Sequence, residues 1–157
     1  MKDHIPYGRQ NISDYDIKKV VNVLKSDWIT QGPTIDSFEK KISTKVNSKY
    51  SIAVNSATSA LHISCLSLGV SNNDLVWTSA NTFVASANCA LLCGAEVDFV
   101  DIDKQTWCMS EVLLEEKLEH HKSKNLKLPK VVIPVHLSGQ SCNMEKIYAL
   151  SKKYGFS

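Results

Sequence analysis

Hydrophobic residues recur at helical spacing along the first 48 residues. The apolar positions of a first stripe are Ile17, Val20, Val21 and Leu24, and those of a second stripe are Ile35, Phe38, Ile42 and Val46. Both stripes follow the spacing of three and four residues that an amphipathic helix requires. The first stripe predicts a helix over 14–26, with Ser13 as its N-cap and Asp16 three residues later. The loop 27–33 separates it from the second helix.

From residue 49 onward, short apolar runs alternate with helical patterns. The runs predict strands at 51–54, 75–78, 96–100 and 130–135. The helical patterns carry Leu61, Cys65 and Leu68; Phe83, Ala87, Ala90 and Leu91; Leu113, Leu114 and Leu118; and Met144, Ile147, Leu150 and Tyr154. A polar linker is predicted at 120–128. Glycines that favour a helix C-terminus stand at the ends of three of these helices, at Gly69, Gly94 and Gly155.

This alternation indicates the fold class. Strands that alternate with helices predict an α/β protein of three layers, in which helices flank a mainly parallel sheet. We therefore expect 1–157 to form a single domain, with a helical arm at 1–48 and a βα core at 49–157. Because another strand is due after the last predicted helix, we expect the chain to be the N-terminal part of a longer protein, truncated at its C-terminus.

Composition narrows the class of protein. With 43% hydrophobic and 22% charged residues, the 157-residue chain has the balance of a folded globular protein rather than of a disordered one. A net charge of +2 does not favour nucleic-acid binding, and no apolar stretch reaches the length of a membrane span. The first residues, Met1 to His4, lack an apolar signal core, which indicates a cytoplasmic protein.

The cysteines are expected to be free thiols. They are Cys65, Cys89, Cys93, Cys108 and Cys142, an odd number without a C-x-x-C pair. Cys89 and Cys93 are four residues apart on a predicted helix, but two further ligands at regular spacing do not accompany them. We interpret the cysteines as packed core residues rather than as metal ligands or as a disulfide framework.

Three loops are expected to meet at one crevice, because ligands of open α/β sheets bind beyond the carboxyl ends of the strands. These loops span 55–59, 79–83 and 136–143. The first leads into a helix through small and hydroxylated residues only, Asn55-Ser56-Ala57-Thr58-Ser59-Ala60. Free N–H groups and the helix dipole favour a phosphate at such a place, although an ordinary N-cap explains the same residues equally well.

Each of the other two loops offers one ring. Phe83, at the start of a predicted helix, is suited to stack on a flat cofactor ring, although a core phenylalanine is the more common role of such a residue. His136, at the end of a strand, is a candidate acid, base or hydrogen-bonding residue, with a structural histidine as the alternative.

Several familiar site motifs are absent from the sequence. It contains no G-x-x-x-x-G-K-[ST], no G-x-G-x-x-G and no G-x-S-x-G. The first absence excludes a Walker-type phosphate loop, the second leaves a dinucleotide site without direct support, and the third disfavours a serine hydrolase.

Five segments together resemble one known family. They are Ile29-Thr30-Gln31-Gly32-Pro33 followed by Phe38-Glu39, Val54-Asn55-Ser56-Ala57-Thr58-Ser59-Ala60-Leu61, Asn81-Thr82-Phe83-Val84-Ala85-Ser86-Ala87-Asn88, Val100-Asp101-Ile102-Asp103, and Pro134-Val135-His136-Leu137-Ser138-Gly139-Gln140. In this order and spacing they resemble the sugar aminotransferases of the DegT/DnrJ/EryC/StrS group, which use pyridoxal 5′-phosphate. The resemblance implies the incomplete large domain of a fold-type I aminotransferase.

The resemblance also implies roles for individual residues. Ala57 and Thr58 match positions that bind the cofactor phosphate, and Phe83 matches the aromatic residue that stacks on the pyridine ring. Positions that face a nucleotide-sugar are matched by Tyr7, Asp27, Trp28, Ile29 and Thr30. His136 lies in a family motif, but the resemblance assigns it no chemical step.

The implied reaction is the amination of a nucleotide-linked keto-sugar. The Asn-Ser-Ala-Thr-Ser-Ala-Leu and Thr-Gln-Gly forms of two motifs resemble the branch that aminates C4 of a UDP-linked 4-keto-6-deoxy-N-acetylhexosamine in pseudaminic acid biosynthesis. The resemblance implies glutamate as the amino donor and a homodimer as the intact enzyme. It places the Schiff-base lysine, and the aspartate that pairs with the pyridinium nitrogen, beyond the equivalent of Ser157, so the chain alone is expected to be inactive.

Three other interpretations stay open. A non-catalytic relative would bind a nucleotide-sugar or pyridoxal phosphate without transamination. A Rossmann-type oxidoreductase would share the alternating strands and helices. A thiol-dependent enzyme would use one of the five cysteines.

Overall fold

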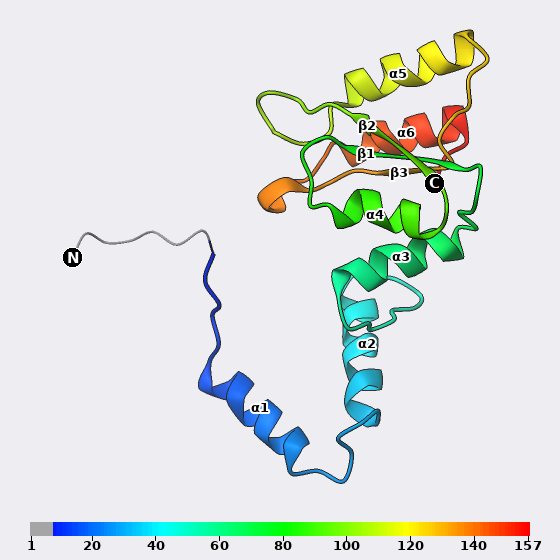
Figure 1. Ribbon diagram of the computed structural model, residues 1–157. Coiled ribbons are helices and arrows are strands. Elements are labelled where there is room, and N and C mark those ends of the chain that lie inside the picture. Colours follow the sequence, from blue (N-terminus) through cyan, green and yellow to red (C-terminus); the bar gives the residue numbers. More distant parts are fainter. Residues whose placement is uncertain (1–7) are drawn as a thin grey trace. The chain divides into compact units, whose positions relative to one another are not determined.

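The computed structural model describes residues 8–157 (Figure 1). The chain forms two compact units, one that ends at Ala53 and one from Val54 to Ser157. None of the helices in residues 8–157 combines the length and the apolar character needed to cross a bilayer.

The first unit contains two helices, α1 (Asp14–Leu24) and α2 (Pro33–Lys45). The predicted N-cap of α1 is confirmed, because the N–H of Ser13 donates to the carboxylate of Asp16 at 2.8 Å while the Ser13 hydroxyl accepts from the N–H of Asp16 at 3.4 Å. This reciprocal pair satisfies two N–H groups that a helix start otherwise leaves free. No side chain of either helix is buried in the described part of the chain, so both apolar stripes are exposed.

The second unit is built on a parallel three-stranded sheet. Its strands are β1 (Leu75–Ser79), β2 (Glu96–Val100) and β3 (Val131–Ile133), in the order β2-β1-β3. Leu75 pairs with Glu96, and Val76 pairs with Val131. The predicted parallel arrangement is therefore confirmed.

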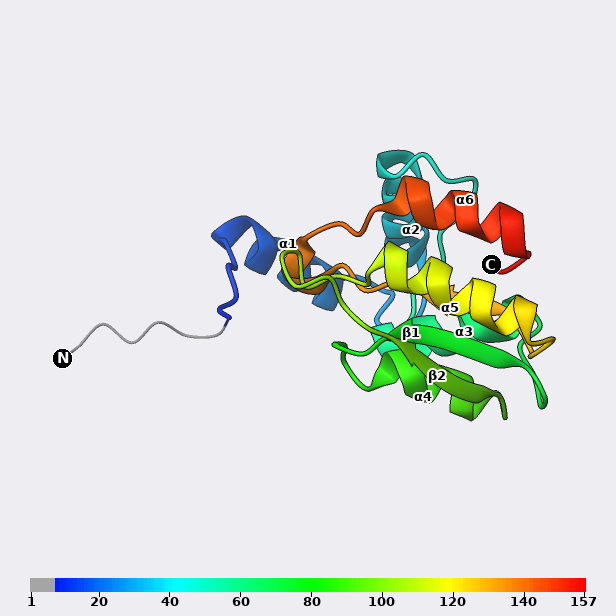
Figure 2. The same cartoon turned by 90° about the horizontal axis from the view of Figure 1, so that it is seen from above.

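Helices cover both faces of this sheet. They are α3 (Ala57–Ser67), α4 (Ala85–Leu92), α5 (Glu111–Ser123) and α6 (Met144–Tyr154). Figure 1 shows α5 and α6 above the sheet and α3 and α4 below it, and Figure 2 looks onto the layer formed by α5 and α6. The predicted three-layer α/β fold is confirmed.

Alternate residues of β1 face alternate layers. Leu75 and Trp77 pack in a cluster with Leu114 and Leu118 of α5, whereas Val76 packs in a second cluster with residues of α3 and α4. The period of two along a strand explains this division, since successive side chains point to opposite faces. Trp77 and Val76 are both fully buried, so β1 is the central element of the core.

One predicted strand is not formed. Residues 51–54 take no regular structure, and Ile52 is 74% exposed. A strand requires a neighbouring strand to accept and donate its backbone hydrogen bonds. Instead, the N–H of Ala53 donates to the carboxylate of Glu39 on α2 at 2.7 Å, which ties this segment to the helix.

Other predicted boundaries also differ from the structure. α1 ends at Leu24 rather than at residue 26, and α4 begins at Ala85, after Phe83. β3 covers only Val131–Ile133 of the predicted 130–135, because Pro134 has no N–H to continue the ladder. α5 extends to Ser123, so the first residues of the predicted polar linker are helical. Their polarity fits the solvated side of a helix, and polarity alone does not end one.

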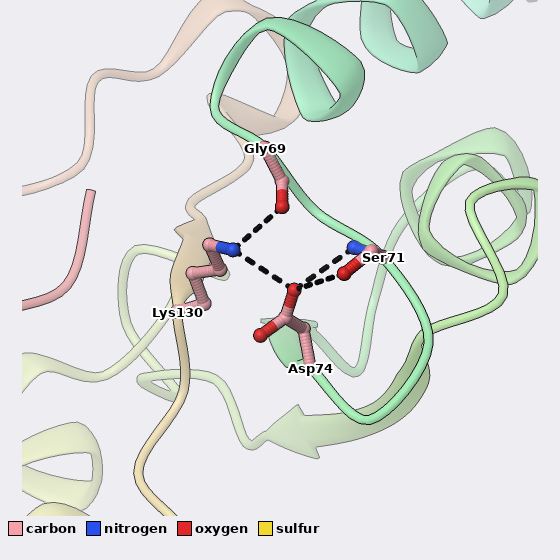
Figure 3. A network of polar contacts seen from close by, with 4 residues as sticks. All are labelled: Gly69, Ser71, Asp74 and Lys130. Atoms are coloured by element: carbon pink, nitrogen blue, oxygen red, sulfur yellow. Dashed lines mark hydrogen bonds and ion pairs between the residues drawn. The ribbon is translucent and has the colours of Figure 1, made fainter.

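A small polar network joins three elements at the amino ends of the strands (Figure 3). The Nζ of Lys130, just before β3, donates to the carbonyl of Gly69 at 2.6 Å and to the carboxylate of Asp74 at 2.9 Å. The same carboxylate accepts from the N–H and hydroxyl of Ser71. The end of α3 is thereby fixed beside the starts of β1 and β3.

Candidate site at the carboxyl edge of the sheet

The loops that follow the three strands lie at the same side of the second unit (Figure 1). The start of α3 points to this side as well. Its end is fixed at the amino edge by the bond from Lys130 to Gly69, and Figure 1 shows its 11 residues extending from there toward the carboxyl edge. A helix of this length spans about 16 Å. The loops predicted to converge, 55–59, 79–83 and 136–143, therefore share one edge of the unit.

The first turn of α3 leaves two backbone donors open. The hydroxyl of Ser56 accepts from the N–H of Ser59 at 3.1 Å, and the carbonyl of Ser56 accepts from the N–H of Ala60. The N–H groups of Ala57 and Thr58 meet no acceptor among residues 8–157, and both residues are exposed. These two residues are the ones that the family resemblance implied for the cofactor phosphate.

The electrostatics of this turn favour an anion. The first turn of α3 carries no acidic side chain that would compete for the open N–H groups. The hydroxyl of Ser59 is occupied, since it donates to the side-chain oxygen of Asn55 at 2.7 Å. The aligned peptide dipoles place partial positive charge at the two open N–H groups. The residues present therefore fit a phosphate ester held mainly by backbone donors.

Phe83 is not a core residue. It stands just before α4 and is 73% exposed, so the interpretation as core packing is wrong. Beside it, the hydroxyl of Thr82 donates to that of Ser86 at 2.8 Å, which ties the loop to the first turn of α4. An exposed aromatic ring at this edge is available to a ligand, while its stacking on a cofactor stays a prediction.

His136 follows β3 in an ordered loop. Its Nδ1 accepts a hydrogen bond from the backbone N–H of Cys142 at 3.1 Å, and its side chain is exposed. The loop includes a short turn at Leu137–Gly139. Burial, and then the neighbouring Cys108, raise the pKa of the Cys142 thiol, so this group stays a protonated donor. It donates to the carbonyl of Val135 at 3.2 Å.

The predicted sugar-facing residues lie in the first unit. Asp27, Trp28, Ile29 and Thr30 form the exposed connection between α1 and α2. Trp28 lines two hollows, one of about 570 Å³ and one of about 610 Å³, and the other three line neither. A Cβ added to Gly32 would lie 2.8 Å from that of Trp28, so the tryptophan rests against the glycine. Tyr7 lies outside the described residues.

The predicted cofactor-binding residues and the predicted sugar-facing residues belong to different units. Ala57, Thr58 and Phe83 share the second unit, whereas the stretch 27–30 belongs to the first.

Sequence reasoning missed the thiols of Cys108 and Cys142, which brace the loop after His136. Their hydrogen bonds to loop carbonyls leave no periodic or motif signal in the sequence.

Parallel strands that end beside an open helix N-terminus form an architecture that α/β proteins use to bind phosphate groups. The sequence profile of the DegT/DnrJ/EryC1/StrS aminotransferase family matches residues 10–157. The chain belongs to this family, whose members depend on pyridoxal phosphate.

Three relatives illustrate the likeness. The chain is 36% identical over 151 residues to the spore coat polysaccharide biosynthesis protein SpsC of Bacillus subtilis (strain 168), covering 96% of this chain and 37% of that protein. It is similar to the PLP form of the putative sugar aminotransferase Spr1654 from Streptococcus pneumoniae, with 32% identity, a TM-score of 0.82 and coverage of 97% and 37%. The chain is also similar to the structure of NtdA from Bacillus subtilis with bound cofactor PMP. The identity is 32% and the TM-score 0.80, and the match covers 93% of this chain and 33% of that one.

The chain matches only part of the length of these relatives. It spans about 37% of the length of SpsC and of Spr1654. The solved neighbours are fold-type I aminotransferases, so the predicted fold class is confirmed for the part that is matched.

Proposed function

We propose that this chain supplies the phosphate-binding turn, and part of the sugar-facing surface, of a pyridoxal-phosphate-dependent sugar aminotransferase. The observation that carries the proposal is the pair of open N–H groups at Ala57 and Thr58. Membership of the family, and relatives solved in PLP and PMP forms, support it. When bound, the coenzyme supplies the electron sink through which an amino group passes from a donor to a ketone.

The proposal gives Ala57, Thr58 and Phe83 distinct roles. The N–H groups of Ala57 and Thr58, with the Thr58 hydroxyl, hold the phosphate. Phe83 covers one face of the ring. Anchoring the phosphate fixes the position of the ring, so that binding energy is used for orientation. The Schiff-base lysine and the aspartate for the pyridinium nitrogen are proposed to lie outside residues 1–157.

For the substrate we propose a nucleotide-linked 4-keto-6-deoxy sugar, UDP-linked, with glutamate as amino donor. The Asn-Ser-Ala-Thr-Ser-Ala-Leu and Thr-Gln-Gly forms of two motifs support the pseudaminic acid branch. The name of SpsC supports a role in polysaccharide biosynthesis. Tyr7 and the stretch from Asp27 to Thr30 are the proposed sugar-facing residues, and Trp28 supports this because it lines two hollows.

Exposed surfaces and free thiols support a proposal about the domains, the oligomeric state and the location of the enzyme. We propose one large domain, with an arm at 1–48 and a core at 49–157, in a protein that forms a homodimer. The exposed apolar stripes of α1 and α2 support an arm that packs on other protein. Five free cysteines support a cytoplasmic location, where thiols stay reduced.

The test is the binding of pyridoxamine 5′-phosphate by calorimetry. This form is chosen because its amine does not condense with surface lysines. Ala57→Glu places a carboxylate in the first turn of α3, where it takes up the open N–H groups and repels the phosphate. Ser64→Glu, on the exposed side of the same helix, is the matched control with the same change of charge.

We expect Ala57→Glu to weaken binding at least tenfold and to leave the helix intact, because acidic residues stabilise helix N-termini. Ser64→Glu is expected to bind as the parent chain does. Equal affinity of the Ala57→Glu variant and the parent chain, or no binding by the parent chain, would contradict the proposed function.

A further inference from the structure

The imidazole of His136 is held with one nitrogen turned inward. A backbone N–H only donates, so the bond from the Cys142 N–H at 3.1 Å requires a lone pair on Nδ1. In the neutral ring the proton must then lie on Nε2. No partner of Nε2 is found among residues 8–157, and the side chain is exposed. The outward face of His136 is therefore an unused N–H donor.

The loop behind this ring is braced by two buried thiols. Cys142 Sγ donates to the Val135 carbonyl at 3.2 Å, and Cys108 Sγ donates to the Gln140 carbonyl at 3.2 Å. Both cysteines are at most 5% exposed. Ser138 keeps a left-handed φ of +52°, a conformation that is unfavourable for a non-glycine residue and is maintained here within the braced loop. The loop is thus preorganised around the imidazole.

The location of the His136 ring indicates which kind of ligand its free N–H contacts. His136 follows the carboxyl end of β3, at the edge where α3 begins and where Phe83 is exposed. We propose that His136 is a ligand-binding residue, whose Nε2–H donates to an oxygen of the organic phosphate bound at this edge. The inference rests on the proposed function, and it adds a donor with a fixed tautomer to a site otherwise built from backbone N–H groups and the Thr58 hydroxyl.

Two substitutions separate the two nitrogens. In His136→Asn the side-chain oxygen takes the place of Nδ1, so the bond from Cys142 is kept and the outward donor is lost. In His136→Gln the amide nitrogen takes the place of Nε2, so the donor is kept and the inner acceptor is lost. A merely structural histidine would tolerate the first change and suffer from the second.

We expect His136→Asn to weaken binding of pyridoxamine 5′-phosphate or of uridine diphosphate by roughly ten- to a hundredfold, the range for a hydrogen bond to a charged group. The hydrogen-exchange protection of the Cys142 amide should be unchanged in this variant. His136→Gln should retain most of the affinity while losing that protection. Which of the two probes responds identifies the oxygen as that of a coenzyme or of a nucleotide.

Nitrogen NMR of the histidine-labelled chain gives a readout that is independent of activity. The resonances of His136 are assigned by their loss in the Asn variant. We expect the Nε2–H tautomer in the free chain and a shift of Nε2 when the probe binds. An Nδ1–H tautomer, or His136 signals that neither probe moves while pyridoxamine phosphate binds in an Ala57-dependent way, would overturn this inference and leave the proposed function standing. Binding of neither probe by the parent chain would overturn both.

Discussion

Gly94 ends α4 in a conformation that only glycine adopts freely. Its φ is +78°, and a Cβ added there would lie 1.8 Å from Oδ1 and 3.0 Å from Cγ of Asn72. Gly94→Ala therefore introduces backbone strain and a steric clash together. Asn72 is exposed, and the nearer atom is the end of its side chain, so rotation relieves the clash. The strain at positive φ has no such relief.

The expected loss of unfolding free energy is about 1–2 kcal/mol, which is the cost of the left-handed conformation for an L-residue. Urea denaturation followed by circular dichroism measures it in four chains: the parent, Gly94→Ala, Asn72→Ala and the double variant. We expect Asn72→Ala alone to be nearly neutral, and the coupling energy between the two sites to be below about 0.5 kcal/mol.

Gly94→Asn is the matched control. Asparagine tolerates the left-handed region better than alanine, so this variant should lose less stability although its side chain is larger. Full recovery of the Gly94→Ala loss in the double variant would refute the reasoning, because the clash with Asn72 would then be the whole effect.

Three further predictions concern the cap, the polar network and the core. Ser56→Asp keeps the N-cap of α3 and adds a negative charge, so stability to urea should stay within about 0.5 kcal/mol of the parent; pyridoxamine phosphate titration should show at least tenfold weaker binding, and undiminished binding would contradict the site. Hydrogen bonds from Lys130, and then from Ser71, lower the pKa of Asp74 below its ordinary 3.8. A carboxyl group with a lowered pKa in the folded state stabilises the fold at pH values above 3.8. The stability advantage of the parent over Asp74→Asn should therefore be constant near neutral pH and vanish as the pH falls through the pKa of the folded state. A gap that persists in acid would count against the ion pair. Leu118→Ala, at a fully buried site, should lose about 2–5 kcal/mol by urea denaturation, whereas Val112→Ala on the exposed side of α5 should be nearly neutral.

Features that depend on neighbouring residues were predictable from the sequence. The capping box of Ser13 and Asp16, and the left-handed glycine that ends α6 at Gly155, are read from short segments because their partners lie within one helical turn. The open N–H groups of Ala57 and Thr58 are local features as well, because the first N–H groups of a helix have no acceptor within the helix. Their availability follows from a helix start that lacks bulky or acidic side chains.

Features that depend on partners distant in the sequence could not be predicted from it. The apolar run 51–54 has the composition of a strand, but a strand forms only when a second segment pairs with it through backbone hydrogen bonds. Here the N–H of Ala53 donates to the carboxylate of Glu39 instead. Likewise, the exposure of Phe83 depends on how α4 packs. The tautomer of His136 is set by the N–H of Cys142, six residues away across a folded loop.

The positions of the thiols make each layer of the second unit separately observable. Cys65 and Cys89 are buried between the sheet and the α3–α4 layer, and Cys108 and Cys142 are buried on the α5–α6 side. Burial raises the pKa of Cys65 to about 11, so alkylating reagents reach a reactive thiolate there only when the layer opens. Partly exposed Cys93 serves as the internal standard. The order in which mass spectrometry finds the two pairs modified would therefore show which side of the sheet opens first in the native protein.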